Sequence, residues 1–345
     1  MTGGSGWLGT RLLRALAHGL PDVPQFAEPD RARSLRCLLP PAADDAGVRA
    51  ICDRIVLFRG DLRDRASLEA FCSGADGAIL YHCAGVVHPM RWTREFFDVN
   101  VEGTRQLLAA AEACGVRRAV VMSSNSPFGL NPGREQRFDE QSPYHPYMGY
   151  GRSKMLMERV VAEFQNHGKL ETVVVRAPWF YGPSQPARQT VFFSMIRRGS
   201  VPIVGDGANL RSMAYVDNLC QGLLLCGQSP GANGETYWIA DARPYSMNEI
   251  VDTIERLMAS EFSIRVSGRR LRLPNVVADV ARGIDAVTQR CGLYLQRIHV
   301  LSEMNGTIAC RIDKARQALG YEPAIELEEG MRRSLQWCIA RGLPL

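Results

Sequence analysis

The sequence has 345 residues, 46% of them hydrophobic, and its 41 basic and 36 acidic residues give a formal net charge of +5. This length and composition fit one large globular domain or two interlocked ones. The basic residues are scattered and no apolar run reaches the roughly 18 residues that span a bilayer, so neither nucleic-acid binding nor a transmembrane segment is expected.

Ten cysteines are spread along the chain, and none of them forms a Cys-x-x-Cys pair. This spacing favours neither a metal site nor a disulfide framework. We therefore expect reduced, mostly buried thiols in a cytoplasmic protein.

Helical and strand patterns alternate through the first half of the chain. Helices are predicted at 10–20, 67–72, 100–114 and 150–164, and strands at 35–39, 54–58, 78–83, 119–122 and 172–175. Such alternation is typical of an α/β protein in which helices cover both faces of a parallel sheet.

The pattern becomes less regular after about residue 183. Ser246 and Glu249 form a capping box before a predicted helix with an apolar stripe, and a last helix is predicted at 328–341. We expect a dinucleotide-binding domain at 1–180, to which 212–240 returns, and a smaller substrate-binding region over most of 181–345.

Glycines recur at every third position near the start of the chain. Such glycines permit a tight turn, close approach of the backbone to a pyrophosphate and close packing of a helix on a strand. The helix that follows would offer free N–H groups to the anion. Together with two short motifs after later strands, they predict a doubly wound sheet of the Rossmann type. The expected cofactor-binding residues are Gly3, Gly6, Trp7, Leu8, Gly9, Asp61, Leu62, Ala84 and Gly85.

The first strand of such a sheet is apparently truncated, because only Met1 precedes Thr2. That strand would be central, and its loss would expose several apolar side chains worth roughly 1.5–3 kcal/mol each. A typical net stability is only about 5–15 kcal/mol. We expect either that the natural chain starts upstream or that another segment fills the place.

Tyr150 and Lys154 lie four positions apart on one face of a predicted helix. A nearby ammonium lowers the pKa of a phenol, which makes it a usable acid or base near neutral pH. Ser124 follows a predicted strand, where an open α/β sheet binds its ligand, and can donate a hydrogen bond to a substrate oxygen. Ser126 is the weaker candidate for that role.

These motifs, together with Asn100–Thr104, Arg176–Pro183 and Gly205–Asn218, resemble the extended short-chain dehydrogenase/reductases, which include NAD-dependent epimerases and dehydratases. The resemblance covers nearly the whole chain. It implies a seven-stranded sheet, NAD or NADP as cofactor, and a homodimer formed through the helices at 103–114 and 150–165. It assigns catalysis to Ser124, Tyr150 and Lys154 and adds cofactor contacts at Asn100, Tyr150, Lys154 and Pro178.

The chain departs from the family pattern at informative places. Nucleotide-sugar dehydratases usually carry Asp-Glu where this chain has Asn125-Ser126, and the sugar epimerases typically carry asparagine at the place of Trp179. Arg211 argues the other way, because it matches a diphosphate-binding arginine of the sugar enzymes. The end of the second strand, where an acidic residue usually indicates NAD and a basic one NADP, falls near Pro40-Pro41, with Asp44 and Asp45 further on, so neither rule applies.

The C-terminal third resembles the branch of 3β-hydroxysteroid dehydrogenases and 2-alkyl-3-oxoalkanoate reductases, which handle hydrophobic alcohols and ketones. An apolar stripe from Val276 to Val287, with Arg269, Arg270 and Arg272 beside it, predicts an amphipathic helix that either packs as a lid or touches a membrane surface. The expected substrate contacts are His88, Met90, Trp92, Asn125, Ser126, Trp179, Phe180 and Arg211.

The sequence therefore favours reversible hydride transfer between a nicotinamide and a secondary alcohol or ketone on a small, hydrophobic substrate. The alternative is a nucleotide-sugar epimerase in which hydride transfer is transient. A third interpretation is a non-catalytic protein that senses NAD(P).

Overall fold

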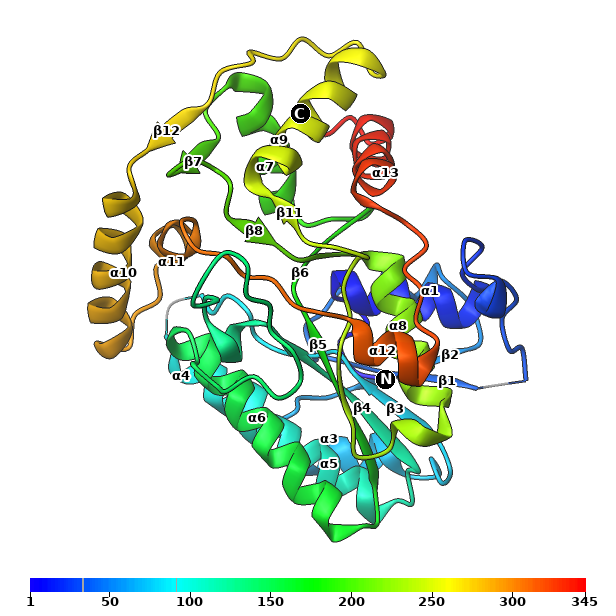
Figure 1. Cartoon of the computed structure of the whole chain (residues 1–345). Coiled ribbons are helices and arrows are strands. Elements are labelled where there is room, and N and C mark those ends of the chain that lie inside the picture. Colours follow the sequence, from blue (N-terminus) through cyan, green and yellow to red (C-terminus); the bar gives the residue numbers. More distant parts are fainter. Residues whose placement is uncertain (33, 91) are drawn as a thin grey trace.

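A computed structural model describes residues 1–32, 34–90 and 92–345. Its centre is a parallel sheet whose strands lie side by side in Figure 1. The sheet confirms the predicted α/β class and the alternation of the first half of the chain. In spatial order, its strands are β2 (Ile55–Arg59), β1 (Leu35–Leu39), β3 (Ile79–His82), β4 (Arg118–Ser124), β5 (Glu171–Ala177) and β10 (Thr236–Trp238).

The first two residues lie between β1 and β3. Thr2 forms parallel bridges to both Leu38 and His82, and the Leu38 N–H donates to the Met1 carbonyl at 2.9 Å. These bridges join the two-stranded and four-stranded parts into one sheet. The segment before the glycine motif thus occupies the central place that the sequence predicts for its strand.

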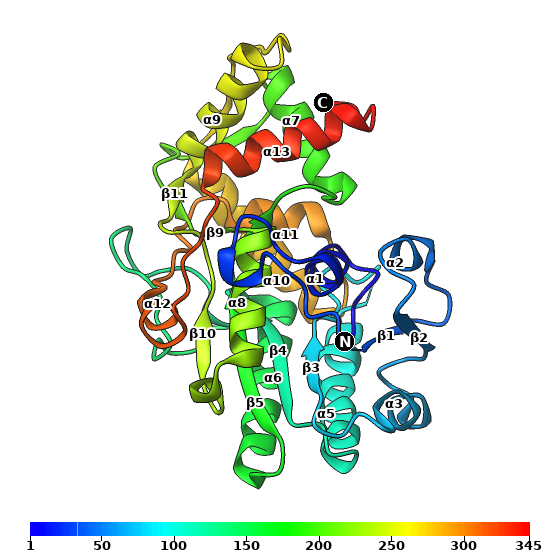
Figure 2. The same ribbon diagram turned by 90° about the vertical axis from the view of Figure 1, so that its right-hand side faces the viewer.

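Helices cover both faces of this sheet (Figures 1 and 2). Successive strand residues point to opposite faces, so Ala119 and Val121 join one hydrophobic cluster and Val120 joins the other. One layer consists of α3 (Arg65–Cys72), α5 (Thr104–Ala113) and α6 (Met148–His167). The other contains α1 (Trp7–His18), α8 (Val216–Gln228) and α12 (Asp313–Leu319).

The C-terminal region stands beyond the carboxyl ends of the strands, in the upper part of Figure 1. Its short strands pair as β6 (Trp179–Tyr181) with β9 (Met213–Tyr215), β7 (Pro202–Val204) with β12 (Leu271–Leu273), and β8 (Leu210–Arg211) with β11 (Tyr245–Ser246). Its helices are α7 (Ala187–Arg198), α9 (Met247–Ser260), α10 (Asn275–Arg290), α11 (Gln296–Glu303) and α13 (Leu327–Ala340).

Several predicted boundaries shift. Helix α1 starts at Trp7 rather than at residue 10, and β4 extends through Ser124. The helix predicted at 100–114 begins earlier, as α4 (Arg94–Phe97) and a π-helical turn (Asp98–Gly103) that continue into α5. The predicted cap of α9 is confirmed, because Ser246 Oγ accepts a hydrogen bond of 3.0 Å from the Glu249 N–H. A four-residue helix, α2 (Ala46–Arg49), precedes β2.

The apolar stripe of α10 points outward, and the helix packs on α6, α11 and β7 through its other side. The buried side of the helix consists of Ala278, Ala281 and Asp285. Asp285 lies there because His299 of α11 provides a partner for its carboxylate. Within the described ranges, no helix combines the length and hydrophobicity that a membrane crossing requires.

A buried ion pair links the sheet to α6. Arg176 Nη2 of β5 lies 2.7 Å from Glu158 Oε2 of α6, with the two side chains only 6% and 3% exposed. Ser123 Oγ and the Tyr144 hydroxyl also donate to the Glu158 carboxylate, at 2.5 and 2.7 Å. The guanidinium lies 4.4 Å from the centre of the Phe128 ring. All of these groups therefore have partners inside the protein.

We predict that Glu158→Ala lowers the free energy of unfolding by about 3–5 kcal/mol, because it leaves the Arg176 charge buried and unpaired. Chemical denaturation followed by circular dichroism measures the change. Glu163→Ala on the same helix is the matched control, since its pair with Arg105 is exposed and should contribute about 0–1 kcal/mol. Equal losses in the two variants would contradict the role given to the buried pair.

Candidate active site

The glycine turn brings its backbone into contact with itself and with β3. Gly3 has a φ of +79°, and the Gly6 N–H donates to the Gly3 carbonyl at 3.0 Å. A Cβ on Gly9 would lie 1.9 Å from the Gly3 oxygen, and one on Gly3 would lie 2.6 Å from the Ala84 nitrogen. The first-turn N–H groups of α1 have no acceptor within the helix, so the turn fits a pyrophosphate.

The side chains of Trp7 and Leu8 point away from this turn. The Trp7 indole donates to the Pro183 carbonyl at 2.8 Å, and its ring centroid lies 4.7 Å from that of Phe180. Leu8 is buried in the core. Trp7 therefore joins the glycine turn to the segment after β6, a contact that the sequence did not reveal.

Asp61 and Leu62 follow β2 directly. The Asp61 carboxylate accepts hydrogen bonds of 2.8 and 2.5 Å from Arg63, and this interaction holds the pKa of Asp61 below its usual value. Leu62 is buried, with its Cβ 2.9 Å from the place of a Cβ on Gly103. We propose that these two residues contact the cofactor, as the sequence predicts.

The Asn100 side chain holds the loop that follows β3 through hydrogen bonds. Its Oδ1 accepts from the Val86 N–H at 2.7 Å, and its Nδ2 donates to the Val86 carbonyl and to Ser153 Oγ at 2.9 and 3.0 Å. A Cβ on Gly85 would lie 3.1 Å from Asn100 Oδ1 and 3.5 Å from Lys154 Nζ. The structure thus brings Gly85, Asn100 and Lys154 together. The Asn100 side chain is hydrogen-bonded to the backbone of the loop at Val86.

The three predicted catalytic residues come from two neighbouring elements. Ser124 ends β4, and Tyr150 and Lys154 lie in the first two turns of α6. The Ser124 hydroxyl lies 3.4 Å from Asn125 Oδ1 and 3.3 Å from Ser126 Oγ, and it accepts a hydrogen bond of 3.3 Å from the Ser126 N–H. Pro178 stands in the break between β5 and β6.

The predicted effect of Lys154 on Tyr150 is wrong for this state of the protein. Burial raises the pKa of Tyr150 to about 12, although a hydrogen bond with Ser124 partly opposes this rise. Burial also lowers the pKa of Lys154 to about 8. The ammonium donates to the Met122 carbonyl at 2.8 Å.

Helix α10 supports the start of α6. The Gly149 N–H donates to Gln289 Oε1 at 2.9 Å, and Gln289 Nε2 donates to Asp285 Oδ1 at 2.9 Å. The other Asp285 oxygen is 2.8 Å from His299 Nδ1. The sequence missed these positioning residues, because Gln289 lies 140 positions beyond Gly149 and no motif links them.

Aromatic side chains surround Tyr150. The Phe96 ring centroid is 5.8 Å from that of Tyr150 and 5.7 Å from that of Tyr294, whose hydroxyl is 2.6 Å from His88 Nδ1. The remaining expected substrate contacts are less close to one another. Trp179 packs against Phe192, Arg211 donates to the Glu303 carbonyl, and Met90 and Trp92 are exposed.

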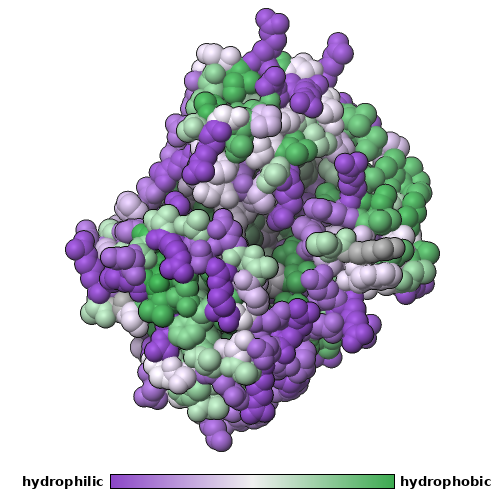
Figure 3. Space-filling model, turned by 180° about the vertical axis from the view of Figure 1, so that it is seen from behind, coloured by the Kyte–Doolittle hydropathy of each residue, from purple (hydrophilic) through white to green (hydrophobic). Residues whose placement is uncertain are grey.

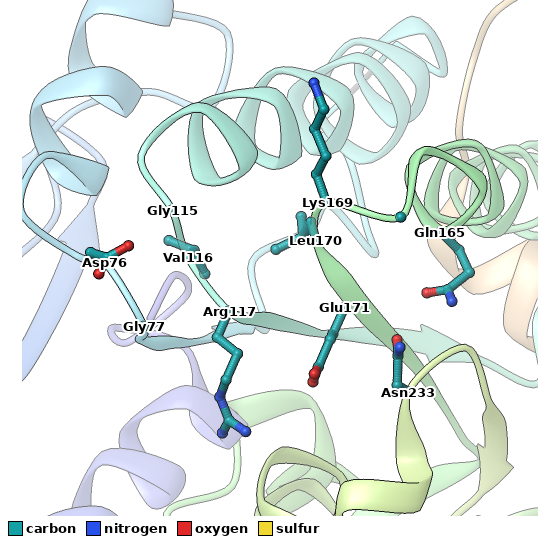
Figure 4. Close-up of a pocket in the computed structure, with 11 residues that line it drawn as sticks. Asp76, Gly77, Gly115, Val116, Arg117, Gln165, Lys169, Leu170, Glu171 and Asn233 are labelled. Atoms are coloured by element: carbon teal, nitrogen blue, oxygen red, sulfur yellow. The ribbon is translucent and has the colours of Figure 1, made fainter.

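A cavity of about 390 Å³ opens at the opposite end of the sheet, before β4 and β5 (Figure 4). Polar side chains line much of it, including Asp76, Arg117, Lys169 and Glu171. None of the predicted catalytic residues takes part. The cavity and the candidate active site are therefore separate places in the fold.

Residues 1–240 match the NAD dependent epimerase/dehydratase family. The chain belongs to this family. The family is NAD-dependent, which agrees with the fit of the glycine turn to a dinucleotide. Its relatives and structural neighbours are dehydrogenases, reductases, epimerases and dehydratases, so the chain is an enzyme with a nicotinamide cofactor.

Relatives cover nearly the whole chain. An uncharacterized protein from Sinorhizobium fredii is 49% identical over 99% of this chain and 95% of its own length. A ketoreductase from Stigmatella aurantiaca, named for 4-hydroxy-2-methyl-3-oxo-4-farnesyl-3,4-dihydroquinoline-1-oxide, is 27% identical over 96% and 93%. The fold matches that of a dTDP-glucose 4,6-dehydratase from Bacillus anthracis in complex with NAD, with a TM-score of 0.75, 19% identity and coverage of 98% and 95%.

Gly9→Ala should weaken NAD binding by at least about tenfold, or roughly 1.4 kcal/mol, because its methyl group would displace the turn that faces the pyrophosphate. Titration calorimetry with NAD measures the affinity. Gly283→Ala is the control, since this glycine also lies in a helix but a Cβ there meets no atom within 4 Å. An unchanged affinity in Gly9→Ala would remove the turn from the cofactor site.

Proposed function

We propose that this enzyme is an NAD(P)-dependent oxidoreductase that interconverts a secondary alcohol and a ketone on a hydrophobic substrate. The observation that carries the proposal is the meeting of the Ser124 and Tyr150 hydroxyls at the carboxyl end of β4, one helical turn from Lys154. In an open α/β sheet this end of the strands is where ligands bind.

The Ser124 and Tyr150 hydroxyls have different roles toward the substrate oxygen. Ser124 donates a hydrogen bond that orients the carbonyl, and Tyr150 donates its proton to the same oxygen during reduction and recovers it during oxidation. The bound nicotinamide supplies or takes up the hydride. Burial raises the pKa of Tyr150 to about 12, so the phenol is protonated at neutral pH and has a proton to donate.

The surroundings of Tyr150 support a hydrophobic substrate. Phe96 packs beside the phenol and Tyr294 packs against Phe96, and burial lowers the pKa of His88 to about 4, so its imidazole is neutral. Asn125 and Ser126 provide no carboxylate for an elimination of water. The ketoreductase relative, named for a farnesylated ketone, agrees with this substrate class.

Purified enzyme with NADH or NADPH and a panel of hydrophobic ketones tests the reaction class. We expect net loss of reduced nicotinamide, followed by its absorbance, and formation of the alcohol. A UDP-sugar panel is run in parallel. Epimerised sugar without net change in the nicotinamide would replace this proposal with an epimerase.

Tyr150→Phe should lower kcat by about 10²–10⁴-fold while NAD affinity stays within a few-fold, because only the proton donor is removed. Steady-state kinetics and NAD titration measure the two quantities. Tyr147→Phe is the matched control. Tyr147 lies three residues before Tyr150, and its hydroxyl hydrogen-bonds Ser302 Oγ. Substantial turnover by Tyr150→Phe would refute the assigned role.

A further inference from the structure

Helix α10 presents a row of aliphatic side chains to the outside. Val276, Val280, Ile284 and Val287 are 58%, 57%, 45% and 59% exposed, and their spacing of three or four residues places them on one side of the helix. Figure 3 shows hydrophobic side chains gathered along this edge of the molecule. Exposed apolar surface of this extent marks an interaction site more often than an accident of packing.

The apolar surface continues beyond the helix. Leu295 and Val300 are 45% and 49% exposed on the segment that follows α10. Next to it lies the loop after β3, because Trp92 pairs with Leu293 and the Thr93 N–H donates to the Gly292 carbonyl at 2.9 Å. That loop carries Met90, which is 99% exposed, and Trp92, which is 54% exposed. We name this surface the α10 face: Met90, Trp92, Val276, Val280, Ile284, Val287, Leu295 and Val300.

The charges around the α10 face are mostly positive. Residues 271–302 contain four arginines and two acidic residues. Asp285 is buried against His299, and Asp279 is held by Arg282 and Asn305. Arg272, Arg290 and Arg297 are exposed, and no ion pair joins them to another residue within the described ranges. The unneutralised charge at this face is therefore cationic.

We propose that the α10 face docks on a bilayer that contains anionic phospholipid. The aliphatic side chains would enter the boundary between headgroups and acyl chains, while the three arginines reach the lipid phosphates. A second copy of the chain fits less well, because Arg272 and Arg290 flank the two ends of α10. Parallel or antiparallel pairing of two α10 helices about a two-fold axis would set arginine against arginine.

The α10 face also lies close to the candidate active site. Met90 of this face is two positions from His88, and His88 is hydrogen-bonded to Tyr294. Tyr294 packs against Phe96, and Phe96 packs against Tyr150. A substrate dissolved in the bilayer would thus have a short path to the catalytic groups. This consequence rests on the proposed function, whereas the docking itself does not.

Co-sedimentation of the full chain with vesicles tests the docking. We expect binding to vesicles of equal parts phosphatidylcholine and phosphatidylglycerol, weaker binding to phosphatidylcholine alone, and release in high salt. The double variant Ile284→Asp/Val287→Asp should bind at least about tenfold more weakly. Ile339→Asp is the matched control, since Ile339 is 43% exposed on α13, outside the α10 face, and should bind like the parent chain.

Cys291 allows a second measurement on the unaltered sequence. It is the exposed cysteine of the chain, four residues beyond Val287, and the other nine are buried or partly buried. An environment-sensitive fluorophore on Cys291 should shift to the blue when the anionic vesicles are added. Absence of both sedimentation and the shift would overturn the proposal. It would also be overturned by a dimeric parent chain that the double variant converts to monomer, since a second copy would then cover the face.

Discussion

The buried ion pair between Arg176 and Glu158 fixes the elements that carry the candidate catalytic groups. Glu158 lies one turn beyond Lys154 on α6, and Ser123, which donates to Glu158, immediately precedes Ser124. A charge left unpaired in the interior is costly, so β4, β5 and α6 have one favourable arrangement. The distance between the Ser124 and Tyr150 hydroxyls therefore depends on a pair of residues that takes no part in the chemistry.

A second constraint is steric and places the cofactor turn at the same end of the sheet. Gly9 and Gly3 allow α1 to start against the backbone of its own turn, and Gly3 allows that turn to lie against Ala84. The indole of Trp7 then holds the segment after β6 over the turn. The glycine turn is thus joined by direct contacts to the residues after β3 and to the segment after β6.

Local patterns predicted much of this from the sequence. Short apolar runs predicted the core strands, glycine spacing predicted the turn, and the spacing of Tyr150 and Lys154 predicted that both lie on one helix, because each signal lies within a few residues. The support of Gly149 by Gln289 could not be predicted in this way, since it joins residues 140 positions apart. Nor could the raised pKa of Tyr150, because its largest cause is burial, which depends on how distant segments pack.

Helix α10 shows why periodicity alone misleads. Its apolar stripe left a packed lid and a membrane contact open, and the buried face of the helix carries Asp285 instead, with its contacts to His299 and Gln289. Those contacts satisfy a carboxylate inside the protein and cap α6, so rotating the helix to bury its valines would break them and leave Gly149 without its acceptor. The aliphatic stripe is consequently held outside by the same network that supports the catalytic helix. In water this arrangement exposes apolar area, which is unfavourable in free energy. Contact with a bilayer surface would bury that area without disturbing the network.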